Sequence, residues 1–449
     1  MEPNVLLESL IDEAGMSRAG LAGHINRAGR ARGLSLRYEH TAVSRWLKGQ
    51  RPRGQVPDLI CEVLGARLTR PVTLDDIGMG TSSGYGTETA AHPASLSGFV
   101  DRATALWRSD EQQRPDLAAV PAVTGTPAVM PVWEWENPPE DTDVSRAGPG
   151  RVSMADIETL RSARDHYEQL YRKAGGIATR PRIVRFLNAE AAPLLRGGHS
   201  DALGRRLHRA TAALVAVAGI CAYDSDAHGL AQRYFHQALR LAKSSGDRAL
   251  GGYVMALLTT QSLFLGEHRR SIAFAEAALR AAGGHITPAL AADLHAMQAK
   301  AYAQLGDATG ARACIARAQA QADRIHTGRE PDETGYVQPG LVDVQVAEAL
   351  LSLGDLDAAR EHAASAVRAP AHDRGRVHRL AMLSHIELLQ GEPDRAAGTA
   401  AEMAERARGM ESQRLRDRLR QVGRELAESG CAHAVQTADL IGGALRVPL

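Results

Sequence analysis

The sequence predicts an all-α protein with a small N-terminal helical domain, a linker and a long C-terminal array of helices. Three observations predict this class. Apolar residues recur at helical spacing near the N-terminus and again from about residue 152 onward. The stretch between these parts is interrupted by Gly, Pro and acidic residues. The last part repeats one loop motif with small residues at fixed offsets. The expected domains are therefore 1–78, 79–150 and 151–449.

The N-terminal domain should contain two short helices that matter for function. Ser17 is a suitable N-cap for the first of them. The second begins at His40 and ends at Gly49, before Pro52. One side of this second helix is an apolar stripe formed by Val43, Trp46 and Leu47. The opposite side carries short polar or cationic side chains, which are Thr41, Ser44, Arg45 and Lys48.

Positive charge is concentrated around the same helices. The whole chain has a net charge of only +1, but between Ser17 and Arg53 there are nine basic residues and one acidic residue, Glu39. Counterion release makes such a patch favour a polyanion. A solvated arginine-rich surface without a partner is the alternative. Charge alone leaves both interpretations open.

Residues 79–150 lack the periodic apolar content of a separate core, and we expect a linker with local ordered segments. A short helix is expected near Leu96–Trp107. Trp133 and Trp135 lie beside Pro131, and two such large apolar side chains should pack against another part of the protein.

The C-terminal part repeats a loop, typically Leu-Gly-Asp, followed by small or apolar residues 5, 9 and 12 positions after the Gly. Steps of four and three lie on one face of a helix, so small residues there allow a partner helix to approach closely. The Gly permits a tight reversal between two helices. An earlier unit has the same offsets without the Gly. The anchors of the five units are Asp226, Gly266, Gly306, Gly354 and Gly391. This pattern resembles the tetratricopeptide repeat and implies an α-solenoid.

The segment from Val43 to Pro52 resembles the second helix of Xre/Cro-type helix-turn-helix regulators, and Leu21-Ala22 resembles the first. That family joins the two helices by about four residues, whereas Arg27 to Glu39 intervene in this chain. Together with the segment His228–Ala242, the chain is similar to actinobacterial regulators that join a helix-turn-helix to tetratricopeptide repeats. One branch of that family is similar to repressors of sporulation and antibiotic production.

This resemblance implies a DNA-binding transcriptional regulator, acting as a homodimeric repressor of developmental or secondary-metabolism genes. The cytoplasm is the expected compartment, because the cysteines form no disulfide pattern and no signal peptide or membrane span is apparent. Thr41, Ser44 and Arg45 would contact bases. The residues expected at double-stranded DNA are His40, Thr41, Ser44, Arg45, Lys48, Gln50, Arg51, Arg53, Arg18 and Arg37. A homodimer is expected because one recognition helix covers only a half-site.

The repeat domain is expected to serve dimerisation and sensing. The concave side of a tetratricopeptide array, lined by the first helix of each pair, commonly holds a peptide or small ligand. Candidate ligand-binding residues on those helices are Asn188, Tyr253, Leu257, Gln261, His295, Gln298 and Gln345. For any single one of them, plain packing or a surface position is the more frequent explanation.

The sequence motifs do not indicate an enzyme. There is no phosphate-binding loop, H-E-x-x-H or strained nucleophile turn, and the four cysteines form no C-x-x-C pair. We therefore expect no catalytic residue, metal or cofactor. No signal peptide or apolar run of about 18 residues is apparent, so no membrane association is expected. The alternative function is a tetratricopeptide scaffold that binds a protein partner and has only non-specific affinity for nucleic acid.

Overall fold

The computed structural model describes residues 3–32, 34–52, 54–68, 72, 74, 76–79, 95–112, 115–137, 141–326 and 328–446. Across these residues the regular structure is helical, and the only β-type pairing consists of two isolated bridges, Arg146 with His199 and Arg151 with Gly198. The all-α prediction is confirmed. The chain divides into two compact units, Met1–Leu106 and Trp107–Leu449, which are described separately below.

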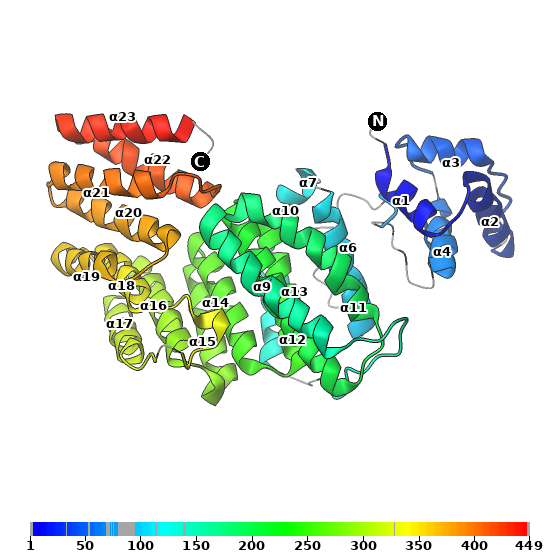
Figure 1. Ribbon diagram of the computed structural model, residues 1–449, viewed down its shortest axis with the longest axis horizontal. Helices are drawn as coiled ribbons and strands as arrows, with labels where there is room; N and C mark the ends of the chain where they lie inside the picture. The colour runs from blue at the N-terminus through cyan, green and yellow to red at the C-terminus, as the bar shows by residue number, and fades with distance from the viewer. Residues whose placement is uncertain are drawn as a thin grey trace. The chain divides into compact units, whose positions relative to one another are not determined.

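In unit 1 four helices surround one apolar core, and these helices are α1 (Val5–Glu13), α2 (Arg18–Ala31), α3 (His40–Leu47) and α4 (Val56–Leu68) (Figure 1). The unit also includes residues 96–106, the first part of a further helix described below. Leu7, Leu21, Trp46 and Leu59 are among the buried side chains that join them. Ser17 caps α2 as predicted, because its hydroxyl oxygen accepts a hydrogen bond of 3.0 Å from the Gly20 amide.

The connection between α2 and α3 is shorter than the sequence suggested. Because α2 continues to Ala31, Arg27 and Arg30 lie on the helix and the connection comprises residues 32–39. The helix can continue because Ile25 is buried in the core and Gly29 leaves room for a returning side chain, that of Leu36.

Part of the expected linker is helical, and from Trp107 onward it belongs to unit 2. Helix α6 (Leu96–Glu111) confirms and extends the predicted short helix, and α7 (Pro115–Ala118) and α8 (Thr126–Glu136) follow it. Trp107 is buried, and its indole donates a 2.9 Å hydrogen bond to the Gln237 side chain. Trp135 is buried against Gly251, whereas Trp133 is exposed. Residues 80–94 of that stretch lie outside the described residues.

The rest of unit 2 begins with α9 (Met154–Ala174), α10 (Gly176–Phe186), the π-helical turn η2 (Leu187–Ala191) and α11 (Ala192–Arg196). Six helix pairs then follow in chain order (Figure 1). The pairs are α12 (Asp201–Asp224) with α13 (His228–Ser245), α14 (Arg248–Phe264) with α15 (His268–Ala282), α16 (Pro288–Gln304) with α17 (Ala308–Ala322), α18 (Pro339–Ser352) with α19 (Leu356–Arg368), α20 (Asp373–Leu389) with α21 (Pro393–Arg406), and α22 (Gln413–Glu428) with α23 (Ala432–Arg446). Two short 3₁₀ turns, η3 (Gly283–His285) and η4 (Asp332–Thr334), lie in connections between pairs. None of the described helices has the length and hydropathy needed to traverse a bilayer.

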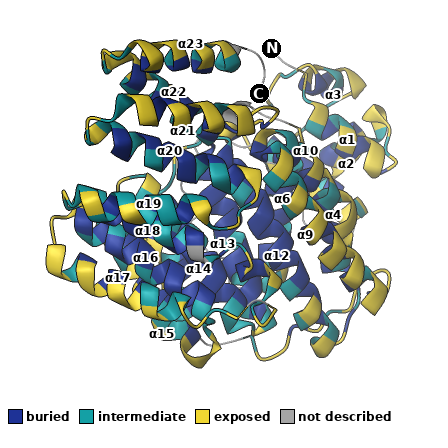
Figure 2. Cartoon of the chain, turned by 60° about the vertical axis from the view of Figure 1, so that its left-hand side comes forward, coloured by how far each residue is buried: buried dark blue, intermediate teal, exposed yellow. Residues whose placement is uncertain are grey.

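Each anchor that the repeat pattern identified has a left-handed backbone. The four glycines have φ between +74° and +79°, and Asp226, with φ +64°, is the only described non-glycine residue with a positive φ. The residues 5, 9 and 12 positions after every anchor are buried. The small residues therefore pack against the partner helix, as their spacing predicts. Figure 2 shows the result: α12, α14 and α16 are mostly buried, whereas α17, α19 and α21 keep an exposed side.

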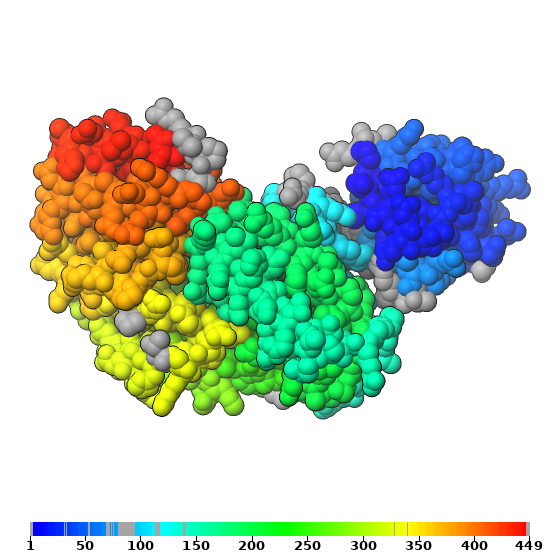
Figure 3. Space-filling view, viewed as in Figure 1, coloured from blue at the N-terminus to red at the C-terminus, as the bar shows by residue number. Residues whose placement is uncertain are grey.

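Segments far apart in the sequence are also joined within unit 2. In Figure 3 the colours of this unit run largely in chain order, since most packing is between neighbouring pairs. The buried Asp224 is an exception, because it accepts hydrogen bonds from the Gly176 amide (2.7 Å) and the Ser412 hydroxyl (2.8 Å) and pairs with Arg374. Asp224 thereby fixes α10, α20 and the start of α22 to the end of α12.

Candidate nucleic-acid interface

Helix α3 has one buried side and one exposed side. Val43, Trp46 and Leu47 enter the core of unit 1. His40, Thr41 and Arg45 are exposed on the other side, and Ser44 is partly exposed. Because apolar residues fix the helix from one side only, its polar side is accessible to a partner.

The predicted polar residues lie where the sequence placed them. Lys48 follows the helix as its C-cap, and Gly49, with φ +92°, ends it. Gln50 and Arg51 are exposed in the next residues. Ser44 donates a 2.9 Å hydrogen bond to the His40 carbonyl, so its hydroxyl oxygen remains as an acceptor. Arg53 lies outside the described residues.

The connection before α3 is held by a side chain that the sequence analysis missed. The Asn26 amide nitrogen donates to the Tyr38 carbonyl, and the Tyr38 amide donates to the Asn26 side-chain oxygen, both at 2.8 Å. The Tyr38 ring lies edge-on to Trp46 with 5.1 Å between ring centroids. Leu36 packs against Gly29, where a Cβ atom would come within 2.5 Å of it. These contacts fix the N-terminal end of α3 relative to α2.

The extended connection presents its side chains alternately. Leu34, Leu36 and Tyr38 are partly buried, whereas Ser35, Arg37 and Glu39 are exposed. This period of two is that of an extended chain with one side packed. Arg37 therefore points away from the core, three residues before the first turn of α3.

Several cations of unit 1 have no acidic partner among the residues described there. Arg18 pairs with Glu8 at 3.3 Å, and Arg32 pairs with Glu62 at 2.7 Å. In contrast, five exposed cations form no ion pair within the described part of the chain, and these are Arg27, Arg30, Arg37, Arg45 and Lys48. Unpaired cations on α2, its connection and α3 produce a positive potential that favours a phosphate backbone.

The seven candidate ligand-binding residues of unit 2 do not form one site. Tyr253 and Gln345 are buried in a polar network around Asp293, which accepts hydrogen bonds from Gln345 (2.7 Å) and from the Tyr336 hydroxyl (2.6 Å). The rings of Tyr253 and Tyr336 lie 6.1 Å apart. Burial, followed by the nearby Glu168 carboxylate, raises the pKa of Tyr253. Both candidate residues therefore serve the packing of the connection between α17 and α18.

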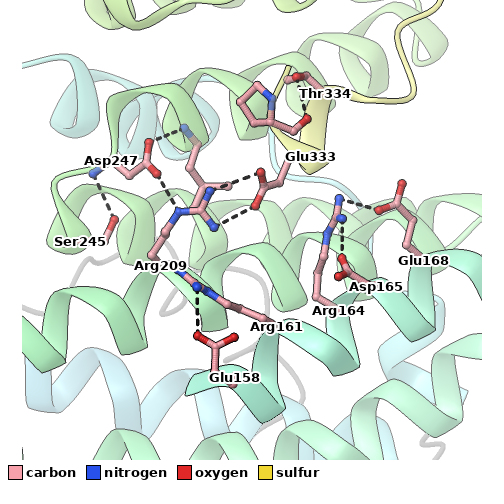
Figure 4. A network of polar contacts seen from close by, with 12 residues as sticks. Glu158, Arg161, Arg164, Asp165, Glu168, Arg209, Ser245, Asp247, Glu333 and Thr334 are labelled. Carbon is pink, nitrogen blue, oxygen red and sulfur yellow. Dashed lines mark hydrogen bonds and ion pairs between the residues drawn. The ribbon is translucent and has the colours of Figure 1, made fainter. Parts of the chain in front are cut away.

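Figure 4 shows the ion pairs beside this network. Glu333 of η4 accepts hydrogen bonds from Arg209 of α12 at 3.0 and 3.3 Å, and Arg209 also bonds Asp247 at 2.9 Å. Arg164 of α9 is buried beside them and bonds Asp165 at 2.9 Å. The segment that carries η4 and Tyr336 thus covers Tyr253, a residue that the sequence predicted to bind a ligand.

The other five candidates are dispersed. Gln261 donates to the His228 carbonyl at 2.8 Å, Asn188 donates to Glu111 at 2.7 Å, and Leu257 is partly buried. His295 and Gln298 are joined by a 3.0 Å hydrogen bond and line one cavity of about 400 Å³. Its other lining residues come from α15, α16 and α17 and are Glu276, Leu279, Arg280, Tyr302, Cys314 and Arg317.

No group of three or more His, Cys, Asp or Glu side chains with the geometry of a metal site occurs among the residues that the structure describes. Ion pairs between segments of unit 2 account for the burial of charged residues such as Arg374, which pairs with Asp224, and Glu333, which pairs with Arg209.

Comparison with known proteins concerns unit 1. Residues 7–80 match the family described as the SP15 N-terminal domain, and this range includes most of α1 and all of α2, α3 and α4. No curated protein matches the chain.

Proposed function

We propose that the protein is a DNA-binding transcriptional regulator in which α2 and α3 form a helix-turn-helix. The observation that carries this proposal is the exposed polar side of α3, opposite Trp46, with unpaired cations around it. A helix of eight residues is about 12 Å long, close to the width of the major groove of B-DNA. Arg45 and Thr41 would then reach base edges, and Lys48 would contact a phosphate.

The connection of residues 32–39 is compatible with this role despite its length. A loose connection would let α3 change its orientation, which would weaken the readout of bases. The Asn26 clamp and the contact of Tyr38 with Trp46 supply the missing rigidity. Arg37 adds a cation just before the first turn of α3, where it would contact the DNA backbone.

The regulator would act as a homodimer on an inverted repeat, because one α3 covers a single half-site and two linked copies multiply the affinity. Unit 2 would be a tetratricopeptide-like module for dimerisation and sensing. A ligand of that module could alter DNA affinity only by preferring one state of the dimer. Repression of developmental or secondary-metabolism genes in the cytoplasm is the role that the resemblance implies.

The experiment is a gel shift with DNA fragments recovered from cells with the protein bound. Arg45→Ala should cost about 1–3 kcal/mol, which is roughly 5- to 150-fold in affinity, and relax specificity at one base position. Lys48→Ala should weaken binding uniformly and lower the slope of log affinity against log salt by about 1. The control is Arg324→Ala, which removes the same charge from an exposed position of unit 2.

Unchanged binding in both variants would remove α3 from the interface. A weak signal that depends on DNA length and disappears with competitor DNA would instead support the second function, a repeat scaffold with non-specific affinity for nucleic acid.

A further inference from the structure

The guanidinium group of Arg414, near the start of α22, stacks on two aromatic rings. It lies 4.2 Å from the centroid of Tyr223 at the end of α12 and 4.9 Å from that of Phe264 at the end of α14. His228 completes the cluster, with its ring centroid 4.9 Å from that of Phe264 and 5.5 Å from that of Tyr223. Stacking of this kind holds a guanidinium in one orientation without using its hydrogen-bond donors.

Those donors have no acceptor within the described residues. Arg414 forms neither a hydrogen bond nor an ion pair there, and its buried Nε atom is unpartnered. Two other arginines of unit 2 have a carboxylate partner, since Arg209 pairs with Glu333, and Arg374 pairs with Asp224. A stacked arginine with unused donors therefore distinguishes this position.

Two further polar atoms of the cluster lack a partner in the part of the chain that the structure describes. Tyr223 is 6% exposed, and its hydroxyl group forms no hydrogen bond there. His228 bonds Asp226 through Nε2 at 2.8 Å, but its Nδ1 atom is unpartnered. Buried polar groups are rarely left unsatisfied, so orphaned atoms gathered at one place indicate a missing ligand or water.

The surroundings of Arg414 are cationic. Arg418, one turn further along α22, lies 3.7 Å from Glu348, which also pairs with Lys300. Burial raises the pKa of Glu348, but Lys300 and Arg418 outweigh burial and leave the pKa below its ordinary value. Arg414 also contributes to lowering the pKa of Glu348, but among the described residues no carboxylate lies within ion-pair distance of its guanidinium group.

An exposed aromatic ring lies beside this cation. Phe264 is 48% exposed, and Leu257, seven residues earlier on the same face of α14, is partly buried. Gln261 lies between them but is buried and bonded to the His228 carbonyl. Leu257 and Gln261 were among the ligand-binding residues that the sequence predicted, whereas Phe264 and Arg414 were not. A cation with an exposed aromatic ring next to it is complementary to an anionic group attached to an apolar one.

We propose that Arg414 binds the carboxylate of a ligand whose apolar part packs on Phe264. The two guanidinium Nη groups match the two oxygens of a carboxylate and would form paired, charge-assisted hydrogen bonds with it. Such a group belongs either to a free carboxylic acid with a hydrocarbon chain or to the C-terminal residue of a peptide. The proposal specifies the class of ligand for the sensing role proposed above. Ligand binding itself does not depend on that role, but any effect of the ligand on DNA affinity does.

The test is isothermal titration calorimetry of the full chain in the absence of DNA. The probes are octanoate and acetyl-Leu-Leu with a free carboxylate, each paired with its uncharged amide. At least one acid should bind with a Kd below about 1 mM, and its amide should bind at least about 10-fold more weakly. Octanoate alone would identify a free acid as the source, and the dipeptide alone would identify a peptide C-terminus.

Variants then connect the binding to this cluster. Arg414→Ala should lower the affinity for the acid at least about 10-fold, and Arg414→Lys should lower it less. Phe264→Ala should lower the affinities for the acid and for the amide by the same factor. Arg420→Ala is the matched control, because Arg420 lies on the same helix and pairs with Asp417. Circular dichroism melts identify any variant that is unfolded, and Arg414→Lys then carries the comparison.

Equal binding of acid and amide, no binding of either acid at about 10 mM, or full affinity in Arg414→Lys and Arg414→Ala would each overturn the proposal. Because the titration contains no DNA, its outcome is independent of the gel shift. Carboxylate binding without operator binding would leave this site in place and refute only the regulatory function.

Discussion

Replacement of Asn26 by Ala should release the connection that precedes α3. The Asn26 side chain makes two hydrogen bonds of 2.8 Å to the backbone of Tyr38. A hydrogen bond contributes about 0.5–1.5 kcal/mol net, so loss of both should lower the free energy of local opening by about 1–3 kcal/mol. Since a factor of ten corresponds to 1.4 kcal/mol, residues of the connection should exchange their amide hydrogens roughly 5- to 150-fold faster.

Hydrogen exchange followed by mass spectrometry measures this directly in the full chain. Peptides that cover residues 34–42 should exchange faster in Asn26→Ala, whereas peptides from α20 in unit 2 should not change. Asn26→Asp is the matched control, because it retains an acceptor for the Tyr38 amide and loses only the donor. DNA affinity should fall in Asn26→Ala although no exposed cation is removed. Unaltered exchange at residues 34–42 would show that the Asn26 contacts do not hold the connection.

Three other predictions concern the stability and packing of unit 2. Gly306→Ala should destabilise unit 2 by about 1–2 kcal/mol because φ is +78° there. Gly398→Ala, on the exposed side of α21, should instead stabilise it by about 0.5–1 kcal/mol. Urea denaturation measures both effects, and effects of the same sign would refute this prediction. Gly251→Ala should displace Trp135, since the new Cβ atom would collide with its indole, and tryptophan emission that does not shift to the red would argue against the packing. Burial, followed by the neighbouring His199, lowers the pKa of His208 from 6.5 to about 3. The unfolded chain therefore binds more protons between these values, so stability should fall as the pH drops from about 6.5 to about 3, and melting temperatures of His208→Gln should depend less on pH over this range.

Local features of the fold could be predicted because they depend on near neighbours in the chain. Ser17 caps α2 by accepting a hydrogen bond from the Gly20 amide, only three residues away, and Gly306 reverses the chain between two helices. The offsets of 5, 9 and 12 identified buried positions because helical periodicity alone determines which residues share a face. The same periodicity predicted that Thr41 and Arg45 would be exposed.

The remaining features depend on contacts between residues far apart in the sequence. Nothing in the local pattern indicates that Asn26 bonds the backbone of Tyr38. Tyr253 looked available for a ligand, but the segment of η4 and Tyr336 covers it. The Arg414 cluster gathers side chains from α12, α13, α14 and α22, and only the packing of the helix pairs brings them together.

The central claim, that the polar side of α3 contacts duplex DNA, is tested most directly by photocrosslinking. p-Benzoylphenylalanine is introduced in place of Thr41 on α3 or, as a control, in place of Asp12 on α1, and each protein is irradiated with a DNA fragment recovered from cells. We predict a crosslink to DNA from position 41 and none from position 12. Bound DNA that crosslinks from position 12 but not from position 41 would contradict the claim.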